Sequence, residues 1–250
     1  MRKECSRNIK LVIEYDGTLF KGWQVQKNNL SVQQVIQETL GKITRHSVTL
    51  YGSGRTDAGV HAKAQVANFK TSDAIKCKNM QKALNSMLPA GVAVSGVAEV
   101  DKDFHARYSA KIKHYRYLIL NRKIPTALER NRVWLIPYKL DIKAMEKGAS
   151  YLIGKYDFKS FGVNPKYRVN NTVKTIFSVG VVKSGAKIRI DIIGDGFLYK
   201  MVRSIVGTLV DIGRGKIKPE DMKRILDSKE RCYASKTAPA QGLYLYKVTY

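Results

Sequence analysis

Hydrophobic positions near the start of the chain follow two different periods. Apolar side chains occupy alternate positions over residues 9–15, which predicts a strand that leads into a turn at Asp16-Gly17. Apolar side chains then recur at helical spacing over residues 32–43. Ser31 and Gln34 form a capping-box pattern at the front of this second run, so we expect a helix to begin there.

The second half of the chain repeats this mixture of strands and helices. The patterns predict strands over 115–120, 173–182 and 187–193, a helix over about 198–212, a last helix with Pro219 in its first turn, and a final strand. This order favours an α+β fold, because no long series of parallel crossovers is present. Two similar α+β halves would place a cleft between them, and no low-complexity linker separates them.

Charge adds the first indication of a partner. Lys and Arg number 45 against 20 acidic residues, a net charge of +25 over 250 residues, and this excess favours a polyanionic partner. Nucleic acid is the leading candidate and an anionic membrane surface is the alternative. No run of about 18 apolar residues and no signal segment is present, so we expect a soluble, cytoplasmic protein. The three cysteines and four histidines lack ligand spacing, so no metal site is expected.

Residues 51–62, with the sequence YGSGRTDAGVHA, form the segment with the clearest chemical potential. Short apolar-alternating runs at 47–51 and 64–69 predict a strand on each side, which places Asp57 at the end of a sheet. The glycines permit close approach of a ligand to the backbone. An ordinary hairpin loop is the alternative. A nucleotide-binding loop is disfavoured, because such loops precede a helix and carry signatures that are incomplete here.

A resemblance to a known family decides between these interpretations. The segment from Gly54 to Ala62, GRTDAGVHA, resembles letter for letter the catalytic motif of the TruA-type tRNA pseudouridine synthases. Further stretches extend the resemblance along nearly the whole chain: Tyr15-Asp16-Gly17-Thr18, Gly22-Trp23-Gln24, Phe104-His105-Ala106-Arg107-Tyr108-Ser109-Ala110, Tyr115-Arg116-Tyr117, Asp157-Phe158, Ser160-Phe161, Met201-Val202-Arg203, Ile205-Val206-Gly207 and Gly242-Leu243-Tyr244-Leu245.

The resemblance implies a fold and an activity. It implies two ferredoxin-like (RRM-like) halves with a joined, mainly antiparallel central sheet and a basic cleft between them. The halves are expected at 1–107, which carries the catalytic Asp, and at 108–250, which completes the active site. It also implies a homodimer that isomerises uridine to pseudouridine without a cofactor. The expected substrate is a uridine on the 3′ side of the tRNA anticodon stem-loop, in the class of enzymes that modify tRNA positions 38 to 40.

The resemblance also assigns roles to four residues. Asp57 is expected to be the nucleophile, and Arg203 is expected to pair with its carboxylate. A structural ion pair elsewhere is the alternative for Arg203. Tyr115 is expected to stack on the target base and to relay a proton, unless it is a sheet-face aromatic. Arg55 is expected to fill the vacated base stack or to hold a phosphate, unless it is a solvated loop residue.

Two basic stretches lie near these residues in the sequence. Each stretch could contact phosphates of a nucleic acid, and a solvated surface is the alternative for each. They are Lys111, Lys113, His114, Arg116, Arg122 and Lys123, and then Arg214, Lys216, Lys218, Lys223 and Arg224. Aromatic residues within the first stretch suit RNA better than duplex DNA. A non-catalytic RNA-binding or RNA-chaperone protein on the same scaffold is the alternative to an enzyme. Such a protein would have no reason to keep Asp57, Arg55, Tyr115 and Arg203 together.

Overall fold

The computed structural model describes residues 7–163 and 171–250, which form an α+β protein with a large, mostly antiparallel sheet. The chain divides into two compact units. The first unit comprises Met1–Lys111 together with Leu245–Tyr250, and the second comprises Ile112–Tyr244. Among the described residues, no helix is long and apolar enough to cross a membrane.

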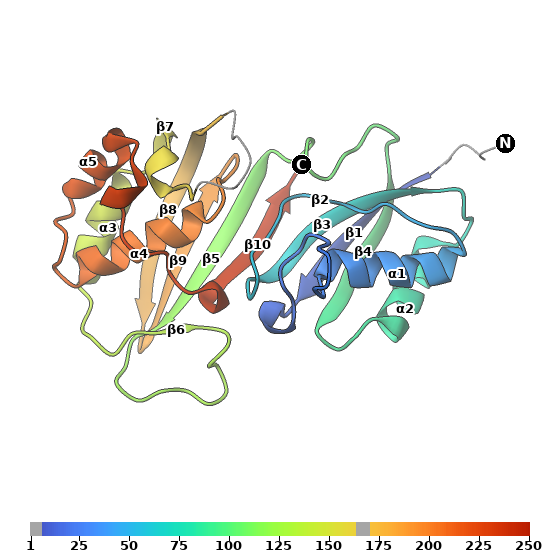
Figure 1. The fold of residues 1–250 in the computed structure, drawn as a ribbon, viewed down its shortest axis with the longest axis horizontal. Helices are drawn as coiled ribbons and strands as arrows, with labels where there is room; N and C mark the ends of the chain where they lie inside the picture. Colours follow the sequence, from blue (N-terminus) through green and yellow to red (C-terminus); the bar gives the residue numbers. More distant parts are fainter. Residues whose placement is uncertain (1–6, 164–170) are drawn as a thin grey trace. The chain divides into compact units, whose positions relative to one another are not determined.

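Three antiparallel strands and two helices form most of the first unit, in the strand order β4-β1-β3 with β2 beside β3 (Figure 1). The elements are β1 (Arg7–Tyr15), α1 (Val32–Thr44), β2 (Tyr51–Gly52), β3 (His61–Thr71), α2 (Cys77–Met87) and β4 (Val92–Val100). The alternating positions predicted for β1 are buried, since Ile9, Leu11 and Ile13 have no exposed surface. The alternation therefore follows the pleat of the strand.

The capping pattern at the start of α1 is half formed. The Ser31 side-chain oxygen accepts a hydrogen bond from the backbone N–H of Gln34 at 3.3 Å, as a helix cap does. The Gln34 side chain donates forward to Glu38 at 2.9 Å instead of reaching back to Ser31. The helix still begins at the predicted residue, Val32.

The strand predicted at 47–51 is wrong, because only its last residue belongs to β2. Val48 and Leu50 are buried, as the pattern indicated. Their carbonyl oxygens accept hydrogen bonds from the side-chain amides of Gln37 (3.1 Å) and Gln33 (2.8 Å), which lie on α1. Side chains of a helix thus take the place of a neighbouring strand.

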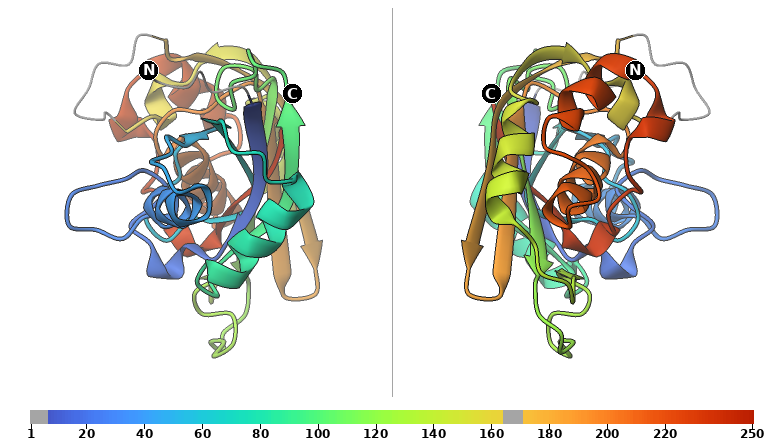
Figure 2. Two further views of the ribbon diagram at one scale, coloured as in Figure 1. Left: turned by 90° about the vertical axis from the view of Figure 1, so that its right-hand side faces the viewer. Right: turned by 90° about the vertical axis from the view of Figure 1, so that its left-hand side faces the viewer.

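Four antiparallel strands in the order β5-β9-β8-β7, with β6 parallel to β5, carry the second unit. The elements are β5 (Ile112–Leu120), β6 (Trp134–Leu135), α3 (Ile142–Ser150), β7 (Gly154–Asp157), β8 (Val173–Ser184), β9 (Lys187–Gly194), α4 (Met201–Gly213) and α5 (Asp221–Ser228). Figure 2 (right) shows α4 and α5 to one side of β8 and β9. Tyr117, Ile188 and Ile190 are fully buried on these strands, and the residues on both sides of Ile188 and Ile190 are polar.

The helix predicted over about 198–212 begins three residues later than expected. Lys200 has a φ of 59°, a left-handed conformation that α4 cannot include. Pro219 likewise lies just before α5, which begins at Asp221, and its carbonyl oxygen accepts a hydrogen bond from the backbone N–H of Met222 at 3.2 Å.

The final strand, β10 (Leu243–Thr249), begins in the second unit and ends in the first. Within the first unit, the backbone N–H of Lys111 donates to Thr249 O at 2.9 Å. The Tyr250 hydroxyl donates to Ala106 O at 2.8 Å, and the ring of Tyr250 lies 4.8 Å from that of Phe104. The C-terminal residues are therefore part of the structure of the first unit.

Candidate active site

Asp57 lies in the loop between β2 and β3, with its side chain half-buried. The backbone N–H of Val60 donates to Asp57 O at 3.1 Å and closes a turn just after the carboxylate. Gly59 has a φ of 78° in this turn, a conformation that favours glycine. The loop therefore holds one carboxylate at the end of a strand, as expected.

Residues 20–23 brace the loop from outside. The backbone N–H of Trp23 donates to Thr56 O at 3.1 Å, and that of Gly59 donates to Phe20 O at 3.4 Å. Gly22 has a φ of 95°, and a Cβ at this position would lie 2.6 Å from Thr56 O. No side chain fits at residue 22. Residues 20–23 can therefore contact the backbone next to Asp57 only because residue 22 is glycine.

A buried polar network supports the loop from inside. The Tyr15 hydroxyl and the Thr56 hydroxyl lie 2.7 Å apart. The Ser53 hydroxyl donates to Gln65 Oε1 at 2.6 Å, and Gln65 Nε2 donates to Gly54 O at 2.9 Å. Burial raises the pKa of Tyr15 far above its ordinary value, so its hydroxyl stays protonated. Both sides of the loop before Asp57 are thus fixed by hydrogen bonds.

The far end of the loop is anchored by a buried histidine. His61 is 3% exposed, and its Nδ1 accepts a hydrogen bond from the backbone N–H of Gly17 at 3.1 Å. The same nitrogen lies 3.2 Å from Asp16 Oδ1. A Cβ on Gly17 would lie 2.1 Å from Val60 O, so the two segments are in direct backbone contact. The Tyr15-Asp16-Gly17-Thr18 stretch therefore packs against the segment that carries Asp57.

Arg55 is exposed but tethered. Its Nε donates to Gln24 Oε1 at 3.1 Å, and Gln24 belongs to the Gly22-Trp23-Gln24 stretch. This hydrogen bond uses one edge of the guanidinium. The side chain itself is exposed, and the role expected for Arg55 stays a prediction.

Arg203 lies in the first turn of α4, in the second unit. Its Nε donates to Ala238 O at 2.7 Å, and the backbone N–H of Ala238 donates to Arg203 O at 3.0 Å. A Cβ on Gly207 would lie 2.0 Å from Lys236 O. Residues 236–238 therefore pack closely against α4 at Gly207.

Tyr115 and Tyr117 share one face of β5, as the strand period indicates. Tyr117 is fully buried and its hydroxyl donates to Pro239 O at 2.7 Å. Burial raises the pKa of Tyr117, and the nearby charge of Arg203 offsets only part of this rise. Tyr115 is 8% exposed, and its ring meets that of Phe197 edge-on at 5.1 Å. Tyr117 therefore packs in the core, and Tyr115 is the candidate for stacking on a base.

Two residues of the first basic stretch form ion pairs with the carboxylate of Asp191. His114 Nε2 lies 2.6 Å from Asp191 Oδ1, and Arg116 Nε lies 2.8 Å from the same oxygen. Arg189 Nε lies 2.8 Å from Asp191 Oδ2. Burial raises the pKa of Asp191, but the hydrogen bonds and charges of Arg116 and His114 lower it by more, so it lies below its ordinary value.

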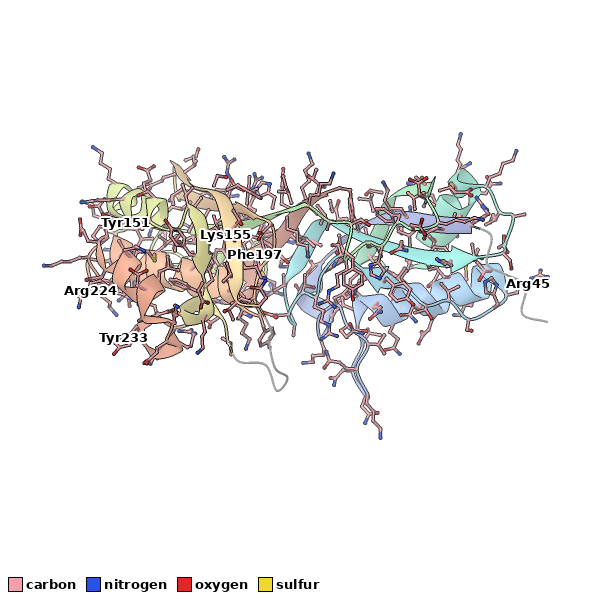
Figure 3. All side chains as sticks on the ribbon, turned by 90° about the horizontal axis from the view of Figure 1, so that it is seen from above. Arg45, Tyr151, Lys155, Phe197, Arg224 and Tyr233 are labelled. Carbon is pink, nitrogen blue, oxygen red and sulfur yellow. The ribbon has the colours of Figure 1, made fainter. Side chains whose placement is uncertain are left out.

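Three members of the second basic stretch also have acidic neighbours, each within four residues in sequence. The ion pairs are Lys223 with Asp227 at 2.7 Å, Arg224 with Asp221 at 3.0 Å, and Arg214 with Asp211 at 3.7 Å. Figure 3 shows Arg224 on the helices of the second unit, away from its strands. Such exposed pairs contribute little to stability, so these side chains can still be available to a ligand.

Asp57 and Arg55 belong to the first unit, and Tyr115 and Arg203 belong to the second. Within the first unit, the structure brings Asp57 together with three supports that had been given no role: Tyr15, Gln24 and Gln65. The stretches that resemble the family contain Tyr15 and Gln24, and this signal could have found them. Nothing in the sequence pattern marks Gln65, which is a polar residue in a strand. The pairing of Asp57 with Arg203 stays a prediction.

The fold and this loop define a strongly basic α+β protein that presents one carboxylate on a rigid, glycine-containing turn. A family model described as tRNA pseudouridine synthase matches residues 11–109 and 149–250. The chain belongs to this family, and within it to the TruA type.

Curated relatives match over almost the full chain. A protein named tRNA pseudouridine synthase A from Thermoanaerobacter sp. (strain X514) is 49% identical over 98% of this chain and 100% of its own length. One named tRNA pseudouridine synthase A 2 from Clostridium perfringens is 49% identical with the same coverage. One from Acetivibrio thermocellus, again named tRNA pseudouridine synthase A, is 47% identical with the same coverage.

A solved structure titled "Crystal Structure of a Cbf5-Nop10-Gar1 Complex" is 11% identical, with a TM-score of 0.35. The match covers 94% of this chain and 57% of that chain.

Proposed function

We propose that this chain is a tRNA pseudouridine synthase that converts uridine to pseudouridine on the 3′ side of the anticodon stem-loop. Asp57 is the nucleophile of the reaction. The observation that carries the proposal is the braced Asp57 loop, in a chain that belongs to this family. The relatives' printed names and the net charge of +25 support tRNA as the substrate.

The reaction is an isomerisation and balances without a cofactor. The bond between uracil N1 and the ribose C1′ breaks, the uracil turns while it is held, and C5 bonds to C1′. The proton on C5 leaves and N1 gains one. A side-chain carboxylate is an established type of nucleophile. The Gly22 brace and the Tyr15 hydroxyl restrict the Asp57 loop to one geometry, which lowers the entropic cost of reaching the transition state.

We propose that the other half of the chain completes this site. Arg203 would pair with Asp57 and keep its carboxylate ionised. Tyr115 would stack on the target base and relay the proton from C5. The target nucleotide must leave its helical stack to reach the carboxylate, and Arg55 would occupy the vacated place or hold a phosphate.

The architecture proposed with this function is that of two ferredoxin-like halves, 1–107 and 108–250. Their sheets would join and a basic cleft would lie between them. The protein would work in the cytoplasm as a homodimer. Equilibrium sedimentation of the purified protein tests the dimer, and a monomer at micromolar concentration would contradict it.

The activity is tested by release of tritium from tRNA that carries uridine labelled at C5, with no added metal or nucleotide. The wild-type protein should release tritium, and Asp57→Ala should lower the rate by roughly 10⁴-fold or more, because the nucleophile is lost. Binding of tRNA by Asp57→Ala should change little. Lys42→Gln, an exposed substitution on α1, is a matched control that should retain full activity.

Two results would contradict the proposal. Full activity of a folded Asp57→Ala protein would exclude Asp57 as nucleophile. Absence of tritium release by wild-type protein that still binds tRNA would favour the non-catalytic RNA-binding alternative. Mapping of the modified positions in the product tRNA tests the anticodon stem-loop assignment separately.

A further inference from the structure

Three neighbouring aromatic rings lie in a row at the surface of the first unit, and the proposed chemistry does not use them. The rings of Tyr51 and His105 lie 5.1 Å apart with an interplanar angle of 47°, and those of His105 and Tyr108 lie 4.4 Å apart at 37°. The guanidinium of Arg107 lies 5.6 Å from the centre of the Tyr108 ring. Three of these residues come from the Phe104–Ala110 stretch, to which the sequence assigned no role. We call this set, Tyr51, His105, Arg107 and Tyr108, the ring row.

The ring row is open to solvent at both ends. Tyr108 is 76% exposed and Tyr51 is 45% exposed. Single exposed aromatic residues are common on protein surfaces, and they need no explanation. A row of three neighbouring rings with an arginine at its end is different, because it combines several aromatic contacts with a positive charge at one place.

Hydrogen bonds fix the middle of the row. His105 Nδ1 accepts from the backbone N–H of Arg107 at 3.1 Å and from that of Tyr108 at 3.4 Å. The backbone of His105 is tied to Ser109, with its N–H donating to the Ser109 hydroxyl at 3.1 Å and its carbonyl oxygen accepting from Ser109 N at 2.9 Å.

The next residue, Ala106, donates its N–H to Asn68 Oδ1 at 2.8 Å, on β3. The row is therefore attached to the sheet and does not hang on a free loop. A surface that is already ordered loses little conformational entropy when a ligand binds.

We propose that the ring row is a platform on which an unpaired base of the RNA substrate stacks, with Arg107 facing its phosphate. Aromatic rings beside arginine are the surface on which single-stranded nucleic acid stacks, without strong sequence preference. Paired bases hide their faces, so the bound nucleotide must be unpaired. Tyr51 begins β2, which leads into the Asp57 loop, so the stacked base and the nucleotide that reacts would be held by the same unit of the chain. This inference rests on the proposed function.

The test compares three variants in equilibrium binding to an unmodified tRNA transcript. Tyr108→Ala should raise the Kd by roughly 5- to 150-fold, the range expected for one lost base stack. Tyr108→Phe keeps the ring and should bind like the wild type. Tyr233→Ala removes a tyrosine that is 61% exposed and lies in the second unit, and it should also bind like the wild type (Figure 3).

A cross-linking experiment locates the contact directly. A tRNA carrying 5-iodouridine at the unpaired positions of the anticodon loop is irradiated with the protein, and the cross-linked peptide is identified by mass spectrometry. A cross-link to Tyr108 or Tyr51 supports the platform. Cross-links confined to other residues, or wild-type affinity in Tyr108→Ala, would overturn it.

The outcomes also separate this inference from others. If wild-type protein releases tritium but Tyr108→Ala binds and reacts normally, the platform fails and the proposed function stands. If wild-type protein releases none, the function fails, while a Tyr108-dependent affinity for a short unpaired oligoribonucleotide would still support the platform. If Tyr108→Ala changes only the oligomeric mass in light scattering, the surface belongs to an interface between copies of the chain.

Discussion

Removal of a single buried hydroxyl, that of Tyr15, is expected to change both the stability of the protein and the rate of the reaction. This hydroxyl lies 2.7 Å from the Thr56 hydroxyl, and Thr56 immediately precedes Asp57. Tyr15 itself is only 3% exposed and cannot reach a substrate from solvent. Any effect of this hydroxyl on the reaction must therefore act through the position of the loop.

The substitution Tyr15→Phe removes the hydroxyl and with it its hydrogen bonds to Thr56 and Gln65. We expect a loss of about 1–2 kcal/mol in the free energy of unfolding, because a buried partner is left unsatisfied. If the loop shifts, kcat should fall by roughly 10-fold with little change in KM. Steady-state kinetics of tritium release and urea denaturation measure the two effects.

The control for Tyr15→Phe is Thr44→Val, which removes a buried hydroxyl that donates to Leu40 O at 2.9 Å at the end of α1. It should cost similar stability and leave kcat unchanged. An equal drop of kcat in both variants would mean that general destabilisation, and no specific positioning by Tyr15, lowers the rate.

At this scale the sequence identified Asp57 as the candidate nucleophile and missed the residues that support its loop. Asp57 stands in a stretch that resembles a catalytic motif letter for letter, so its position could be read directly. Gln65 contacts Gly54 and Ser53 across the β2–β3 connection, and such contacts depend on the strand register. No local pattern reports register, so this part of the site needed the structure.

Among the elements, strongly periodic segments were predicted well, whereas the short apolar run at 47–51 and the weakly apolar helix α2 were not. The helix over residues 32–43 shows a wide apolar face, whereas α2 buries only Met80 and Leu84 and has no side-chain cap at its start. The segment 47–51 has the alternation of a strand, but glutamine side chains of α1 bind its backbone. Tertiary partners of this kind override a local preference.

The strands β5 and β9 are joined by the ion cluster at Asp191, which gives a pH-dependent contribution to stability. The pKa of Asp191 is lower in the folded protein than the ordinary value of about 3.9. The unfolded chain therefore binds more protons between these two pKa values, and stability rises with pH across that interval. The contribution is fully present above the unfolded-state pKa and is lost as the pH falls through the folded-state pKa.

The substitution Asp191→Asn should accordingly lower the free energy of unfolding by about 1–2 kcal/mol at pH 7. The difference from wild type should shrink as the pH falls below about 4. Urea denaturation at several pH values measures this. Asp227→Asn, which breaks an exposed pair with Lys223, should show a much smaller difference at every pH. A constant difference for Asp191→Asn down to the lowest pH would argue against the ion cluster as its source.

At the scale of the whole molecule, the excess of basic residues is expected to determine how the affinity for tRNA depends on salt. Each phosphate contact releases counterions from RNA, so affinity falls as salt rises. We expect the logarithm of the tRNA affinity to fall linearly with the logarithm of the KCl concentration. Filter binding between 50 and 200 mM KCl measures the slope.

Single lysines give the matched comparison. Lys216→Gln, in the second basic stretch, should reduce the magnitude of the slope by about one if this stretch contacts a phosphate. Lys42→Gln, outside both basic stretches, should leave the slope unchanged. An affinity independent of salt would mean that charge does not contribute to binding, against the interpretation of the composition.

The placement of residues 245–250 in the first unit has a consequence for how the protein is made. A ribosome completes residues 1–111 first, yet these residues then lack the segment that holds Lys111 and Phe104 in place. The whole second unit must be synthesised before that segment appears. The nascent first unit therefore waits with an unfilled sheet edge, and such edges are prone to pair with other chains. The unit that carries Asp57 is therefore translated first but is completed only when residues 245–250 have been made.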